Sequence, residues 1–332
     1  MSSKQRIQWY RSPIPPEDLA RLNQRNDWKG WVQSLGHLAI LVVTGGLAWL
    51  AVGRLPLIAV LALLFLHGSV YAFLVNGFHE LCHKTVFKSR FLNILFRDIY
   101  SFLGWYNHVF FWASHQEHHK YTLHPPDDLE VVLPVNLTLR SYLSFAFINP
   151  IGLYNRLKGV LQLSFGVIEG EWANHLFPPE DTEKRRELFN WARFLLVGHG
   201  LIVIVSLASG LWMIPVLVTL APFYGAGFQY LLNEAQHIGL SDHVSDYRLN
   251  TRTILLNPVV QFLYWHMNYH IEHHMYAAIP CYNLSKVHDR IKGDLPHCPR
   301  GIIETWSVII PILRQQRINP AYQYVPELPQ QA

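Results

Sequence analysis

The uncharged segment 194–232 constrains the fold of this chain more than any other feature. It holds 39 residues without a single Asp, Glu, Lys or Arg. At about 1.5 Å of rise per helical residue, it is too long for one crossing of a bilayer core and about right for two. Ser209 and Gly210 supply a turn near its middle. The sequence therefore predicts a hairpin of two membrane helices over 194–210 and 213–232.

A second hairpin is predicted closer to the N-terminus. The apolar stretches 31–53 and 56–75 are each about as long as a helix that crosses a bilayer. Only 15% of the residues are charged, against about 25% in soluble proteins. We predict an all-α membrane protein with four transmembrane helices in two hairpins. Two further apolar segments, 91–112 and 137–168, are interrupted by polar residues and are expected to form interfacial helices.

The charge pattern predicts which side of the membrane each part occupies. Basic residues precede and follow the first hairpin, whereas its connecting loop holds only Arg54. The positive-inside rule then puts both ends of this hairpin in the cytosol. We expect a cytosolic N-terminal segment over 1–30, a membrane domain over 31–290 and a cytosolic C-terminal segment over 291–332. The catalytic face and both termini would be cytosolic, in the endoplasmic reticulum of a eukaryote or the inner membrane of a bacterium.

Four short motifs concentrate histidine: HELCH, HQEHH, NEAQH and HIEHH. Spacings of i, i+3 and i+4 bring the imidazoles of one motif to one side of a helix. HELCH and NEAQH follow directly after the two predicted hairpins, so all four motifs are expected at one membrane face, as a histidine-rich cytosolic cap. The candidate metal ligands are His79, His83, His115, His118, His119, His237, His270, His273 and His274, with Asn233 as a tenth.

The number and type of these ligands indicate the metal. Neutral imidazole is the commonest side-chain metal ligand, and nine of them are more than one zinc ion uses. A nitrogen-rich set without thiolate suits iron better than calcium or magnesium, which prefer oxygen. The sequence therefore predicts a two-iron site that reacts with O2. Acidic residues near the motifs are expected to accept hydrogen bonds from ligating rings; these are Glu80, Glu117, Glu272, Asp127 and Asp128.

Three other histidines, His37, His67 and His199, lie inside the predicted spans and are expected to be hydrogen-bonded core residues. Two alternatives to a di-iron oxygenase stay open. A membrane zinc hydrolase would need only about three protein ligands. A protein that stores or transports metal would need ionisable side chains deep within its spans. The histidine motifs lie at the ends of the spans.

At these motifs the chain resembles the membrane fatty acid desaturase superfamily, which also contains hydroxylases, ketolases and oxidative decarboxylases. HELCH, HQEHH and HIEHH match the histidine boxes of that superfamily in type and order. NEAQH is similar to the asparagine–histidine motif of its acyl-CoA branch. The segments HELCHKTVF and WASHQEHHKYTLHPPDDLE are also similar to a subgroup that includes a bacterial hydrocarbon oxygenase of rhizopine catabolism. The resemblance implies a di-iron centre, four membrane helices and a cytosolic cap.

The resemblance also implies the chemistry. The expected reaction uses O2 and external electrons to desaturate an aliphatic chain, in a fatty acyl or lipid substrate. Hydroxylation, or another C–H oxidation of a smaller lipophilic metabolite, is the alternative. The sequence lacks the HPGG haem motif of a fused cytochrome b5, so a separate cytochrome b5 or ferredoxin and its reductase are the expected electron source. No nucleic-acid partner is expected. The basic residues proposed to receive the carrier are Lys84, Lys88, Arg90, Lys184, Arg185 and Arg186.

Overall fold

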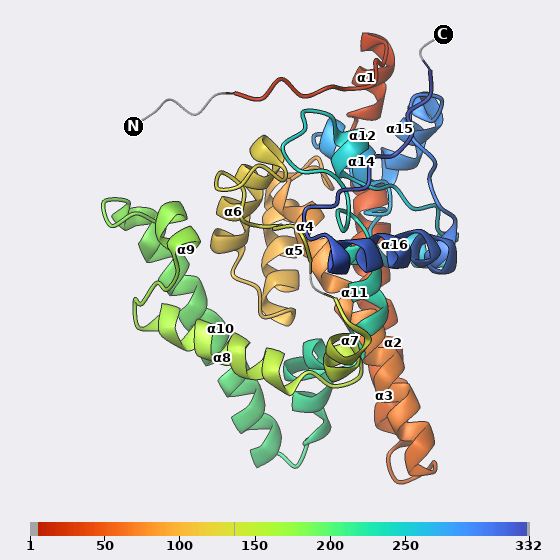
Figure 1. Ribbon diagram of the computed structural model, residues 1–332. Coiled ribbons are helices and arrows are strands. Elements are labelled where there is room, and N and C mark those ends of the chain that lie inside the picture. Colours follow the sequence, from red (N-terminus) through yellow and green to blue (C-terminus); the bar gives the residue numbers. More distant parts are fainter. Residues whose placement is uncertain (1–5, 136, 331–332) are drawn as a thin grey trace.

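The computed structural model describes residues 6–135 and 137–330, and within them the chain is helical, with isolated β-bridges and no β-strand (Figure 1). The structure thus confirms the all-α prediction. The helices, in order, are α1 Pro16–Leu22, α2 Asp27–Ala51, α3 Leu57–Ala72, α4 Leu74–Cys82, α5 Arg90–Leu103, α6 His108–Tyr121, α7 Leu139–Ala146, α8 Pro150–Ser164, α9 Glu171–Leu176, α10 Thr182–Ala208, η1 Pro215–Thr219, η2 Ala221–Phe223, α11 Gly227–Glu234, α12 Tyr247–Asn250, α13 Pro258–Leu263, α14 His270–Met275, η3 Cys281–Asn283, α15 Leu284–Ile291 and α16 Gly301–Ile318.

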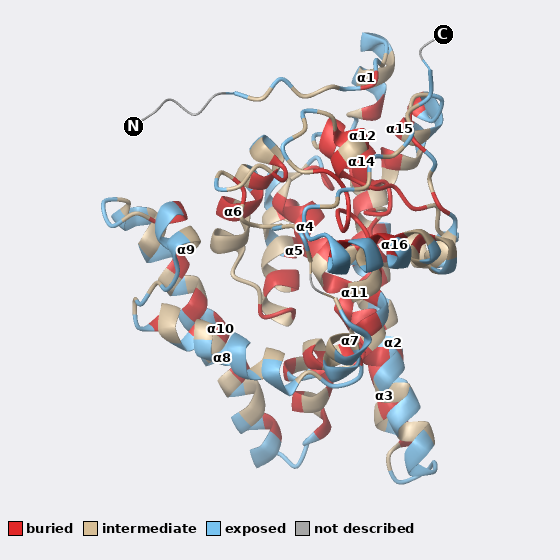
Figure 2. Cartoon of the chain, in the orientation of Figure 1, coloured by how far each residue is buried: buried red, intermediate tan, exposed pale blue. Residues whose placement is uncertain are grey.

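Three helical segments of the described chain are long and apolar enough to cross a membrane: α2, the joined pair α3–α4 over Leu57–Cys82, and α10. They overlap most of the first three predicted spans, although α10 begins well before residue 194. Large apolar side chains on their outer faces are open to the surroundings, with Val42, Ile58 and Ile204 at 74%, 75% and 66% exposure. Figure 2 shows this exposure along the free end of α3. Apolar faces of this extent identify an integral membrane protein.

The fourth predicted span is not a single helix, and in this respect the prediction for 213–232 is wrong. The segment divides into a π-helix (η1), a 3-10 helix (η2) and the start of α11. Pro215 and Pro222 lack the N–H group that a continuous helix requires. Gly225 has a φ of +74°, a conformation that ends a regular helix and that side chains disfavour. The apolar composition was read correctly, but these three residues break the helical hydrogen-bonding pattern.

Side chains of neighbouring helices satisfy the carbonyl groups that this break leaves open. Four consecutive carbonyls accept hydrogen bonds of 2.9–3.1 Å: Val216 from Tyr224 Oη, Leu217 from His67 Nε2, Val218 from Tyr71 Oη and Thr219 from Trp105 Nε1. Irregular backbone at membrane depth is tolerated only when protein satisfies its polar groups in this way. His67 is thus hydrogen-bonded inside the protein. The two other histidines within the spans are bonded as well: His199 to the Phe102 carbonyl at 2.9 Å and His37 to the Val70 carbonyl at 3.1 Å. The prediction that these histidines are satisfied core residues is confirmed.

Helix α3 approaches the broken segment closely at Gly68. A Cβ atom there would lie 2.3 Å from both Cδ2 and the carbonyl oxygen of Tyr224. We expect Gly68→Ala to lower the apparent melting temperature of the purified protein, because overpacking of a filled contact costs about 1–3 kcal/mol. Gly46→Ala on α2 is the matched control, since a Cβ there meets no atom within 4 Å. Equal melting temperatures for the two variants would contradict this close approach.

The other helices build a cap at one end of the membrane helices. The segment 91–112 forms most of α5 and the start of α6, and 137–168 forms α7 and α8. Figure 2 shows buried residues gathered where α4, α6, α12 and α14 meet. The largest apolar core lies here and includes Phe78 of α4, Tyr100 of α5, Tyr247 of α12 and Met275 of α14. The helices that carry HELCH and HIEHH therefore share one core, and Phe111 and Trp112 of α6 pack against it.

Candidate metal centre

Each histidine motif lies at a place where the chain is locally fixed. HELCH occupies the end of α4, with His83 at its C-cap. HQEHH lies in α6, whose first turn is capped by Asn107 through hydrogen bonds to the N–H groups of Val109 and Phe110. His237 follows α11, and HIEHH opens α14. Thus four separate elements bring their imidazoles to one region, as the motif spacing predicted.

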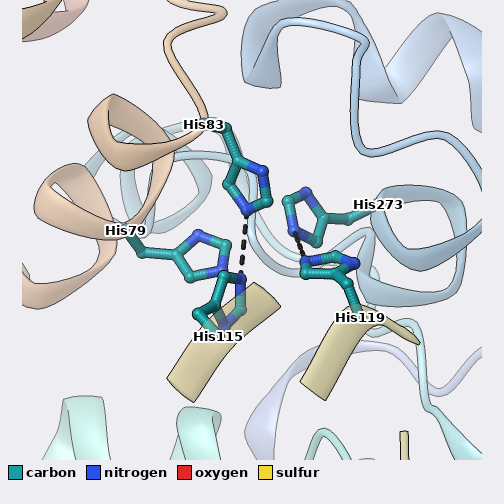
Figure 3. A group of neighbouring side chains, drawn as sticks. All are labelled: His79, His83, His115, His119 and His273. Carbon is teal, nitrogen blue, oxygen red and sulfur yellow. Dashed lines mark hydrogen bonds between the residues drawn. The ribbon is translucent and has the colours of Figure 1, made fainter. Parts of the chain in front are cut away.

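The first cluster contains five imidazoles (Figure 3). One ring nitrogen from each lies within 4.8 Å of those of the others, and the members are His79, His83, His115, His119 and His273. Nε2 of His83 is 3.1 Å from Nε2 of His115. Nε2 of His119 is 3.2 Å from Nε2 of His273. Figure 3 shows these rings pointing toward a common centre.

The second cluster contains four imidazoles. His118, His237 and His274 have ring nitrogens within 4.8 Å of one another. Nε2 of His270 joins them, at 3.1 Å from Nε2 of His237 and 3.2 Å from Nε2 of His274. All nine predicted histidines therefore belong to one cluster or the other.

Two motifs contribute to both clusters. In α6, the i, i+4 pair His115 and His119 enters the first cluster while His118 enters the second. In α14 the arrangement is reversed, because the i, i+4 pair His270 and His274 joins the second cluster and His273 the first. Each of these helices thus holds both clusters at once.

The hydrogen bonds at the outer ring nitrogens show that the inner nitrogens fit a metal ion. Nδ1 of His237 donates to the carbonyl oxygen of Asn250 at 2.8 Å, and a carbonyl can only accept. Nε2 of this neutral ring therefore carries a lone pair directed into the cluster. Two nitrogens about 2.1 Å from one ion, at a right angle, would lie about 3 Å apart. The inner contacts of 3.1–3.2 Å match this spacing, and the donor set suits a metal.

Buried carboxyl groups hold the outer nitrogens of other rings, as is usual around metal-binding histidines. Asp128 accepts a hydrogen bond from Nδ1 of His118 at 2.9 Å. Glu80 lies 3.1 Å from Nδ1 of His79. Glu130, which the sequence analysis missed, accepts from Nδ1 of His115 at 2.8 Å. Its place two residues after Asp128, in the same acidic loop, was the available signal.

The contacts of the remaining predicted residues are with other groups. Glu272 bonds His288 and Thr253, so it supports α14 without contacting a motif histidine through these bonds. Glu117 forms an ion pair with Lys120 at 2.7 Å, and its predicted role stays a prediction. The role of Asp127 stays a prediction. Asn233 lines the cavity beside the second cluster, where its Oδ1 accepts a hydrogen bond from Asn76 at 3.4 Å.

Burial keeps most of these rings neutral and ready to bind a cation. Loss of solvation, together with the neighbouring imidazoles, lowers the pKa of His115, His119, His273 and His274 well below its usual value. The pKa of His237 falls to about 3 for the same reasons. His118 differs, since burial is outweighed by the charge and hydrogen bond of Asp128, which raise its pKa. This ring is the most basic of the set.

Two adjoining cavities lie beside the clusters. The inner cavity, of about 350 Å³, is lined by His79, His115, His118, His237 and His270, among others. The outer cleft, of about 740 Å³, lies between α4, the turn 105–107, α6 and α8 and has mostly apolar walls. Both share Val75, Phe111 and Glu130. An apolar ligand in the cleft could therefore reach the imidazoles.

Comparison with known proteins places this arrangement in a family. No curated protein matches the chain. The family model described as fatty acid desaturase matches residues 48–306, well over half of the sequence, and this range contains all four histidine motifs. The expected superfamily is thereby confirmed. The chain belongs to the fatty acid desaturase family.

Proposed function

We propose that this protein is a membrane di-iron oxidase that uses O2 to remove two hydrogens from an aliphatic chain, most simply that of a fatty acyl or lipid substrate. One observation carries the proposal. Nine imidazoles from four elements form two adjacent clusters, and their free nitrogens converge beside a cavity that continues into an apolar cleft. A zinc hydrolase would leave most of these ligands without a role.

Bound iron would supply the reaction with O2 and the electron transfer that the side chains cannot provide. The protein's own residues orient the imidazole rings and keep water away from the reacting chain. Asp128 and Glu130 hold the rings of His118 and His115 through their Nδ1 atoms, which directs Nε2 inward. The apolar side chains of Val75 and Phe111 form the passage between cleft and clusters. A chain lying there is kept close to the reacting centre and away from water.

A second reaction, hydroxylation of a smaller lipophilic metabolite, is favoured by the size of the cleft. A volume of about 740 Å³ falls in the range of pockets for compact ligands, about 300–1,000 Å³. Both reactions begin by taking hydrogen from an unactivated C–H bond. They differ in whether the product loses two hydrogens or gains one oxygen, so the mass of the product distinguishes them.

The proposal extends to the membrane arrangement and the electron source. The broken segment 215–223 with α11 would return the chain to the side on which the other motifs lie, which is taken as cytosolic because of the surrounding basic residues. Asn233, beside the inner cavity, is proposed as an additional and weaker ligand. A separate cytochrome b5 or ferredoxin would dock near Lys88 and Arg90. Both residues are exposed, and both follow His83 of the first cluster closely in the sequence.

The decisive test compares the intact protein with His118→Ala in cells and after purification. We expect iron in the purified protein, O2 uptake with a reduced carrier, and an oxidised lipid or metabolite that mass spectrometry finds only with the intact protein. His124→Ala is the matched control, because His124 bonds the Thr122 carbonyl outside both clusters. Electrostatic docking of the carrier also predicts slower uptake at high salt.

Two results would contradict the proposal. One is zinc without iron in a protein that consumes no O2. The other is an unchanged product profile in His118→Ala. O2 uptake that does not change with salt concentration would contradict only the basic docking surface for the electron carrier.

A further inference from the structure

The outer cleft contains one cation. Its lining is largely aromatic and aliphatic, with Phe78, Tyr106, Phe110 and Trp172 among the wall residues, yet Arg156 of α8 also faces it. Arg156 is solvent-accessible and lies in the cleft lining. A cation that is open to solvent and lies beside apolar walls can be reached by an anionic ligand that enters the cleft.

The guanidinium is held by neutral partners. Nη1 donates a hydrogen bond to the carbonyl oxygen of Trp105 at 3.3 Å, and the guanidinium carbon lies 5.4 Å from the ring centre of Tyr106. A guanidinium has five N–H donors, so these contacts leave most of them available. They fix its position without neutralising its charge.

No carboxylate of the described residues forms an ion pair with Arg156. The neighbouring cation on the same helix behaves differently, because Lys158 pairs with Glu169 at 3.8 Å on the outer surface. The cleft therefore offers an anion site that the chain does not fill.

The junction of the cleft with the inner cavity carries the opposite charge type. Glu130 lines both the cleft and the inner cavity, and its Oε2 is buried without a hydrogen-bond partner. A carboxylate ligand would be repelled by the acceptor oxygen of Glu130 and attracted by Arg156. Its apolar end would then point past Phe111 toward the histidine clusters.

We propose that this cleft takes an aliphatic carboxylic acid as the free acid, with its carboxylate on Arg156 and its alkyl chain directed to the metal centre. This inference rests on the proposed function and narrows its substrate class. Arginine pairs with a carboxylate through two parallel hydrogen bonds, which fix both position and direction. An ester or amide of the same chain cannot form that pair. Arg156 is thus a residue that determines specificity and positions the chain.

Binding of decanoate and methyl decanoate to the full-length, metal-free protein in phosphatidylcholine nanodiscs tests this, with empty nanodiscs correcting for partition into lipid. We expect the intact protein to prefer decanoate. Arg156→Gln should weaken the binding of decanoate about tenfold or more, because a hydrogen bond to a charged group contributes about 1.5–3 kcal/mol. Methyl decanoate should bind to Arg156→Gln as tightly as to the intact protein, and this result would also show that the variant folds. Arg156→Lys should recover part of the loss, and Lys158→Gln should lose nothing.

Three outcomes would overturn the proposal: no preference for decanoate, equal losses for acid and ester in Arg156→Gln, or displacement of Arg156-dependent binding by phosphatidylglycerol but not by decanoate. The last would assign Arg156 to a membrane phosphate. Because binding is measured without metal or turnover, failure here leaves the proposed oxidation standing. Loss of the oxidation leaves this binding result intact.

Discussion

Replacing His237 with alanine is expected to leave about one iron per chain, against the two proposed for the intact protein, and to lower the proposed C–H oxidation roughly a thousandfold or more, a barrier increase of about 4 kcal/mol. The second cluster has only four imidazoles, and His237 provides the one closest to His270, at 3.1 Å. Three ligands would remain there. The first cluster keeps all five of its rings, so it should still bind metal.

Metal analysis and O2 uptake of the purified variant check this prediction. His83→Ala is the matched variant in the other cluster, and it should retain more iron than His237→Ala because four imidazoles remain around its site. A His237→Ala protein that still carries two irons and turns over normally would show that the second cluster is not a metal site.

The second large effect is expected at Asp128. Substituting asparagine should reduce metal affinity or activity by about 10–100-fold, the usual consequence of losing the partner of a metal-binding histidine. Asp128 accepts hydrogen bonds from Nδ1 of His118 and from the backbone N–H groups of Leu123 and Glu130. Both carboxylate oxygens are thus acceptors. An asparagine has only one acceptor oxygen, so its NH2 group would face an N–H donor.

Glu117→Gln provides the comparison for Asp128→Asn. It makes the same change from acid to amide within the second motif, but it alters the ion pair with Lys120. Iron titration of both variants, with thermal unfolding as the check on folding, distinguishes a role at the metal from a general loss of charge. Equal iron affinity in the two variants would remove Asp128 from the metal centre.

The histidine site could be predicted largely from the sequence. Spacings of i, i+3 and i+4 fix which side of a helix each ring occupies, so the convergence of HELCH, HQEHH and HIEHH followed from helix geometry. The division of His118 from His115 and His119 did not, because it depends on the angle at which α6 crosses its neighbours. The sequence also could not predict that the Asn250 carbonyl orients His237, since every residue has a carbonyl group.

The membrane part shows a similar limit. Apolar length identified α2, α3 and α10, because a bilayer requires about twenty apolar residues whatever their order. Pro215, Pro222 and Gly225 are visible in the sequence, but whether the membrane part tolerates a broken helix there depends on distant side chains that donate hydrogen bonds to its carbonyls. His67 comes from α3 and Trp105 from the turn after α5, and nothing in their local sequence indicates that role.

The sharing of α6 and α14 between the clusters has a consequence for how the centre fills. Each helix presents rings to both clusters, so an ion bound in one cluster immobilises the backbone that carries ligands for the other. Part of the conformational entropy that ordering the other cluster's ligands would cost has then already been lost when the first ion binds. Metal uptake should accordingly be cooperative, with the half-loaded protein scarcer than independent sites would allow.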